Sequence, residues 1–85
     1  FPVSTPSVPD NRARAFCAAL AEETSGMSAG SWRMLDTVAS RMRLGFFEAE
    51  AIAKDCARRG WTQIAADTVR LKDEGRAVVL EGRRA

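Results

Sequence analysis

Glycines at regular intervals divide most of the chain into stretches whose apolar residues repeat with helical spacing. Gly26, Gly45, Gly60 and Gly75 each follow such a stretch. Glycine is the usual residue just past a helix because it adopts a left-handed backbone without a steric penalty. The sequence therefore predicts helices that end at these glycines. With 85 residues, the chain suffices for one domain with one modest core.

The first two predicted helices have clear caps and apolar faces. Asp10 is a candidate N-cap for a helix that runs to Gly26, and Ser31 is a candidate N-cap for one that runs to Gly45. The first helix is predicted to bury Ala13, Phe16, Cys17, Leu20 and Ala21. The second is predicted to bury Trp32, Leu35, Val38, Ala39 and Met42.

The second half of the chain combines two more helical patterns with two short extended ones. Residues 48–59 predict a third helix, whose inward face holds Ala49, Ile52, Ala53 and Cys56. Residues 62–74 predict a fourth helix, which ends at Gly75. Residues 44–47 predict a short bridge of strand, and the β-branched run at 76–82 predicts a further strand.

Composition and charge narrow the class of protein. The net charge of +2 argues against a non-specific polycation such as a histone-like tail. Residues 1–9 contain three prolines and no charged side chain, which predicts a flexible leader ahead of a single domain over residues 10–85. The sequence has neither a long apolar run nor the pattern of a signal peptide, so a cytoplasmic protein without membrane contact is expected.

Side chains suited to catalysis or metal binding are sparse. The sequence contains no histidine and no tyrosine, and it has no phosphate-binding glycine loop, so neither an enzyme nor a bound cofactor or metal is expected. Cys17 and Cys56 stand in alanine-rich helical patterns, which favours buried thiols, with a disulfide between them as the alternative. Trp32 and Trp61 fall on apolar stripes, which favours core anchors over platforms for single-stranded nucleic acid.

The order of these elements resembles the winged helix-turn-helix family over residues 31–84. The bridge strand and first helix of that motif are similar to GFFEAEAIAKD, its recognition helix is similar to TQIAADTVRLKDEG, and its exit into the wing is similar to LKDEGRAVVLEGRR. The resemblance implies a mainly α fold with a small β element, winged helix-turn-helix-like, with an extra N-terminal helix.

The same resemblance implies binding of double-stranded DNA, with a recognition helix at about residues 62–74 in the major groove. Gln63 and Arg70 are then candidate readers of adenine and guanine. The carboxylate of Asp67 would oppose phosphate unless it accepts a hydrogen bond from cytosine. The full set of predicted DNA-binding residues is Arg58, Arg59, Thr62, Gln63, Ala66, Asp67, Arg70, Arg83 and Arg84.

Such a module would serve a transcriptional regulator or a plasmid or phage replication or partition protein. Two alternatives stay open. A protein–protein interaction domain, acting as an adaptor or inhibitor on the same scaffold, is favoured by the acidic residues at 62–74. An accessory domain of a larger nucleic-acid enzyme is favoured by the proline-rich start. The apolar stripe of the first helix either packs against the domain or forms a homodimer contact.

Overall fold

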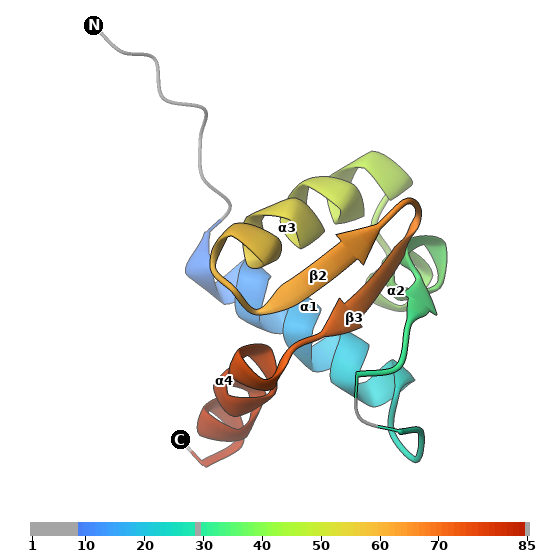
Figure 1. The fold of residues 1–85 in the computed structure, drawn as a ribbon. Helices are drawn as coiled ribbons and strands as arrows, with labels where there is room; N and C mark the ends of the chain where they lie inside the picture. The colour runs from blue at the N-terminus through green and yellow to red at the C-terminus, as the bar shows by residue number, and fades with distance from the viewer. Residues whose placement is uncertain (1–8, 29, 85) are drawn as a thin grey trace, which may run out of the picture.

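The computed structural model describes residues 9–28 and 30–84, and its ribbon is shown in Figure 1. Within these ranges the chain forms four helices and one three-stranded antiparallel sheet. The elements in chain order are α1 (Asp10–Glu23), β1 (Arg33–Met34), α2 (Leu35–Met42), α3 (Phe46–Arg58), β2 (Thr62–Ala65), β3 (Thr68–Leu71) and α4 (Asp73–Arg84).

Three helices and the sheet surround one core. Helices α1, α2 and α3 contact one another, β2 lies along α3, and α4 packs against α1 (Figure 1). The sheet has the order β1-β3-β2. Helices α2 and α3, joined by residues 43–45, form a helix-turn-helix, and the hairpin of β2 and β3 forms a short wing beside it. The predicted fold class, mainly α with a small β element and winged helix-like, is confirmed.

Helix α1 contributes one buried face to this core. Ala13, Phe16, Cys17 and Leu20 are fully buried, as their helical spacing predicted. These side chains therefore pack against the domain, which is the first of the two alternatives given for this face. The helix ends at Glu23 rather than Gly26, since the Thr24 hydroxyl donates to the carbonyl of Leu20 and closes the last turn.

The second helix is shorter at both ends than its sequence pattern predicted. Arg33 and Met34 pair with Val69 and Thr68 in the sheet, so α2 starts only at Leu35. Trp32, predicted to be a core anchor, precedes this strand and is 41% exposed. The first backbone N–H of α2 donates to the carbonyl of Asp67 at 2.8 Å, which ties the helix to the tip of the hairpin.

The connection between α2 and α3 also differs from prediction. Arg43, with φ of 58°, takes the left-handed position after α2, whereas Gly45 has φ of −69° and is the N-cap residue of α3. The expected strand at residues 44–47 is wrong, because α3 already begins at Phe46. Its buried apolar residues, Ala49, Ile52, Ala53 and Cys56, are those predicted for the third helix.

The predicted recognition helix at residues 62–74 is wrong. The segment forms the antiparallel pair of β2 and β3, in which Thr62 faces Leu71 and Ile64 faces Val69. Within β3, Val69 and Leu71 are buried and alternate with less buried neighbours, which is the period of a strand. Pairing with β1 on one side and β2 on the other therefore overrides the helical spacing in this segment.

The strand predicted at residues 76–82 is also wrong, because this run belongs to α4. The acidic first turn of α4 suits the positive end of the helix dipole. Gly75 does not stop a helix but lies buried within this turn, where a Cβ atom would come within 2.2 Å of the carbonyl oxygen of Trp61. That carbonyl accepts a hydrogen bond from the backbone N–H of Lys72 at 2.9 Å. Gly75 therefore permits the close approach of α4 to the segment between α3 and β2.

Candidate nucleic-acid interface

The outer side of α3 carries a row of exposed side chains. Phe47, Ala51, Lys54 and Arg58, hereafter the α3 stripe, follow one another at spacings of four, three and four residues, which places them on one side of a helix. All four are exposed, while the opposite side of α3 is fixed in the core. The stripe is thus presented by a rigid element of the helix-turn-helix.

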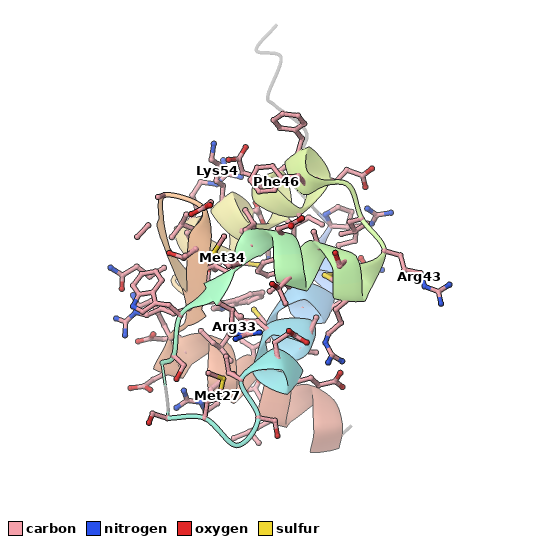
Figure 2. All side chains as sticks on the ribbon, turned by 90° about the vertical axis from the view of Figure 1, so that its right-hand side faces the viewer. Met27, Arg33, Met34, Arg43, Phe46 and Lys54 are labelled. Carbon is pink, nitrogen blue, oxygen red and sulfur yellow. The ribbon has the colours of Figure 1, made fainter. Side chains whose placement is uncertain are left out.

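Aromatic side chains occupy the first turn of α3. The rings of Phe46 and Phe47 meet edge to face, with centroids 5.8 Å apart. Phe46 is partly buried and packs on the core, whereas Phe47 is 81% exposed. Figure 2 shows Phe46 and Lys54 at the same end of the molecule, the end formed by α3. Phe46 therefore supports an apolar ring that projects into solvent.

Charges beside the α3 stripe nearly balance. Lys54 lies 3.9 Å from Glu50, and Glu48 lies 3.8 Å from Arg12. Exposed pairs of this kind contribute little to stability, because water screens both partners. Two cations, Lys54 and Arg58, and two carboxylates, Glu48 and Glu50, share the outer face of α3, so the charges on this face sum to zero.

A buried carboxylate organises the C-terminal end of α3. Asp55 is 5% exposed and accepts hydrogen bonds from Arg58 at 2.8 Å and from Arg59 at 2.7 Å. Burial raises the pKa of Asp55, but these two guanidinium groups outweigh it and leave the pKa below its ordinary value. Arg59 also donates to Asp10 and lies over the Trp61 ring at 5.1 Å. Arg59 is thus held within the fold, while the side chain of Arg58 remains 71% exposed.

Several of the DNA-binding residues predicted from sequence lie on the hairpin. The Thr62 hydroxyl is buried on β2 and donates to the carbonyl of Ala53, so Thr62 does not begin a recognition helix. Gln63 accepts a hydrogen bond from Arg70 at 2.8 Å, and the Arg70 guanidinium lies 5.6 Å from the Trp32 ring centroid. Gln63 and Arg70 therefore engage each other and Trp32 on the sheet and do not project from a helix.

The remaining predicted residues lie at two further places. Ala66 and Asp67 form the tip of the hairpin, where Ala66 has φ of 55°. Arg83 and Arg84 end α4, but their side chains lie outside the described ones. Helix α4 sits at the end of the molecule away from α3 in both views (Figures 1 and 2). The predicted set thus does not form one surface.

Sequence reasoning missed Phe47, Ala51 and Lys54. For Ala51 and Lys54 the signal was present, because they lie off the apolar face predicted for residues 48–59, whereas Phe47 fell in the strand expected at residues 44–47. The helix was assigned to the first helix of the motif, so its outer side received no function. Arg58 is the one predicted residue that the structure places in the α3 stripe.

Residues 9–28 and 30–84 contain no group of three or more His, Cys, Asp and Glu side chains suited to a metal ion. None of the helices in this part of the chain is long and apolar enough to cross a membrane. Cys17 and Cys56 are free and buried, as the alanine-rich pattern predicted. Comparison of the chain with family models, curated proteins and solved structures finds no match.

Proposed function

We propose that the protein is a cytoplasmic DNA-binding module that places α3 in the major groove of double-stranded DNA. The observation that carries this proposal is the α3 stripe, an exposed row of side chains on the second helix of a helix-turn-helix whose other side is locked in the core. In helix-turn-helix proteins the second helix lies in the major groove and its N-terminal residues contact base edges. Regulation of transcription, replication or partition is the process such a module serves.

The dimensions of the α3 stripe suit this geometry. From Phe47 to Arg58 the stripe spans about 16 Å along the helix axis, at about 1.5 Å per residue. This length corresponds to roughly five base pairs at about 3.4 Å each. The aromatic first turn would lie over base edges, and Arg58 at the other end would reach a phosphate.

The charge distribution sets the expected strength of the electrostatic term. Two phosphate contacts, from Lys54 and Arg58, correspond to a slope of about −1.8 in log K against log salt concentration. We expect this shallow dependence because the nearby carboxylates Glu48 and Glu50 offset further attraction. The affinity would then rest more on base contacts than on phosphates.

A second candidate function uses the same surface. A protein–protein interaction domain is favoured by the exposure of Phe47, at 81%, together with the near balance of charge around it. An exposed aromatic ring on a rigid helix is a common anchor in protein interfaces. The two candidates differ in what the cations contribute, since phosphate binding requires Lys54 and Arg58 and an apolar protein contact does not.

The proposal is tested by fluorescence anisotropy with duplexes selected by the protein from a pool with a randomised centre. Lys54→Gln combined with Arg58→Gln should weaken binding and bring the salt slope close to zero, because each lost phosphate contact lowers the slope by about one. The matched control, Lys72→Gln with Arg76→Gln, removes the same charge just before and within the first turn of α4, outside the α3 stripe.

The outcomes separate the two candidate functions. Equal loss of affinity in both double variants would point to non-specific attraction and contradict the proposal. Failure to select any duplex, with a stable complex on a partner protein that depends on Phe47, would favour the protein–protein interaction domain. Circular dichroism of each variant establishes that the fold is retained, in particular after Arg58→Gln, which removes one partner of Asp55.

A further inference from the structure

We infer that α3 selects its DNA target by contact with thymine methyl groups, made by Phe47 and Ala51. The inference rests on the proposed function and names what that surface recognises. It follows from the chemistry of the side chains that the N-terminal half of the α3 stripe presents to a base edge.

The N-terminal half of the stripe is apolar. Phe47 and Ala51 are exposed and neither side chain can donate or accept a conventional hydrogen bond. Among the groups that base pairs present in the major groove, the C5 methyl of thymine is the apolar one, and contacts to it come from alanine and phenylalanine side chains. These two positions therefore distinguish thymine from cytosine by a methyl contact and cannot read donors or acceptors.

The Phe47 ring is held in place for such a contact. It packs edge to face on Phe46, with an interplanar angle of 82°, and Phe46 in turn packs on the core. A supported ring loses less rotational freedom on binding than a free one. The ring is thus positioned before DNA arrives, although it remains 81% exposed in the free protein.

The spacing along α3 sets the order of bases. Phe47 and Ala51 are separated by about 6 Å along the helix axis, or roughly two base pairs. Lys54 follows by about 4.5 Å along the axis, and its ammonium group makes the phosphate contact of the proposed function. The selected site should therefore contain two thymines about two base pairs apart.

Two carboxylates border this region, and one of them, Glu48, lies 3.8 Å from the guanidinium group of Arg12. Glu50 lies one residue before Ala51 and could accept a hydrogen bond from cytosine N4. Its side chain is 34% exposed and lies 3.9 Å from the ammonium group of Lys54. Glu50 is thus mostly covered and faces a cation of its own helix, and Phe47 and Ala51 are the apolar groups exposed in this part of the stripe.

The test removes the methyl groups and nothing else. The selected duplex is prepared with deoxyuridine in place of thymidine, which keeps every base pair, and both duplexes are titrated against the unaltered protein. Burial of one methyl-sized group corresponds to about a fourfold change in affinity. We expect the two contacts together to give about a 15-fold loss.

Two variants show which side chains are responsible. Phe47→Ser should bind more weakly, and deoxyuridine should cost it only about fourfold, through Ala51. Lys54→Gln should also bind more weakly, with a shallower salt slope, but should keep the full response to deoxyuridine. Since Phe47 is largely exposed, its replacement should leave the melting temperature close to that of the parent, which circular dichroism verifies.

The results separate recognition of thymine methyl groups from DNA binding, the proposed function on which it rests. If the duplex binds and the parent protein does not respond to deoxyuridine, methyl recognition is overturned while DNA binding stands. An equal response in the parent and in Phe47→Ser would assign the effect to DNA shape and would also overturn it. If no duplex is bound at all, the proposed function fails and the inference fails with it.

Discussion

Replacing Gly75 by alanine should destabilise the protein, whereas the same replacement at an ordinary helical glycine is stabilising. Replacing glycine by alanine inside a helix stabilises it by about 1 kcal/mol through backbone propensity alone. At Gly75, however, the new Cβ would lie 2.2 Å from the carbonyl oxygen of Trp61, which is 1.2 Å short of the 3.4 Å where ordinary contact begins. It would also lie 2.7 Å from Cδ1 of Leu71.

The expected loss of stability depends on which atoms must move to make room for the new Cβ atom. Overpacking a well-packed site costs roughly 1–3 kcal/mol. The Trp61 carbonyl cannot retreat freely, because it accepts the hydrogen bond from Lys72, and the loss of that bond costs about 1 kcal/mol. After subtraction of the propensity gain, we expect Gly75→Ala to lower the free energy of unfolding by about 2 kcal/mol. In a domain of this size that corresponds to a fall in melting temperature of roughly 8–16 °C.

Gly82 provides the matched control in the same helix. A Cβ atom there meets nothing within 4 Å, so Gly82→Ala should leave the protein unchanged or stabilise it by up to about 1 kcal/mol. Thermal and urea unfolding, followed by circular dichroism, measure both variants. If Gly75→Ala were as stable as Gly82→Ala, the close approach of α4 to Trp61 would be refuted, and the placement of α4 with it.

The remaining predictions concern backbone strain and pH. Arg43→Gly should raise the free energy of unfolding by about 0.5–1 kcal/mol, because Arg43 has φ of 58° and a left-handed residue with a side chain is strained. Gly45 is the control, because its φ of −69° is unstrained and nothing lies within 4 Å of a Cβ atom added there. Gly45→Ala should therefore gain no stability from relief of strain. A larger gain in stability at Gly45 than at Arg43 would contradict the assignment of strain to Arg43. The pKa of Asp55 is lowered in the folded protein, so its contribution to stability is complete above the unfolded pKa of about 3.9 and is lost as pH falls through the lower, folded value. Urea unfolding between neutral and acidic pH should therefore show a steeper loss in the parent than in Asp55→Asn, and parallel curves would exclude this linkage.

The sequence predicts best the elements whose apolar pattern has one interpretation. Helix α1 was predicted because Phe16 and Leu20 recur at helical spacing and no competing strand pattern exists. The buried side of α3 was predicted for the same reason. Fold class followed from these helices and from the expectation of a small sheet, without the correct location of each strand.

The hairpin could not be predicted because its pattern fits two periods. Ile64, Thr68 and Leu71 are spaced for a helix, yet Val69 and Leu71 alternate as a strand requires. Its turn lacks the usual signal, since Ala66 occupies a left-handed position where glycine or asparagine is common. Pairing with β1, which lies far away in the sequence, settles the conformation, and no local pattern contains that information.

The candidate site on α3 was not predicted from the sequence, for a related reason. Because residues 62–74 were predicted to be the recognition helix, Arg58 was the one residue on the outer side of the preceding helix that was given a role, and Phe47 and Lys54 were not predicted to bind DNA. Arg58 was predicted on charge alone and is exposed in the α3 stripe. Arg59, its neighbour, illustrates the limit of charge as a guide, because its guanidinium is committed to Asp55 and Asp10.

The bond between the Leu35 N–H and the Asp67 carbonyl limits how this domain can be altered. It anchors the apex of the hairpin to the opening turn of α2, so residues inserted at the apex would detach the start of that helix. Lengthening the wing to gain new contacts would thus disturb the scaffold. Under the proposed function, attempts to change the DNA target should instead vary Phe47 and Ala51, which are exposed on α3.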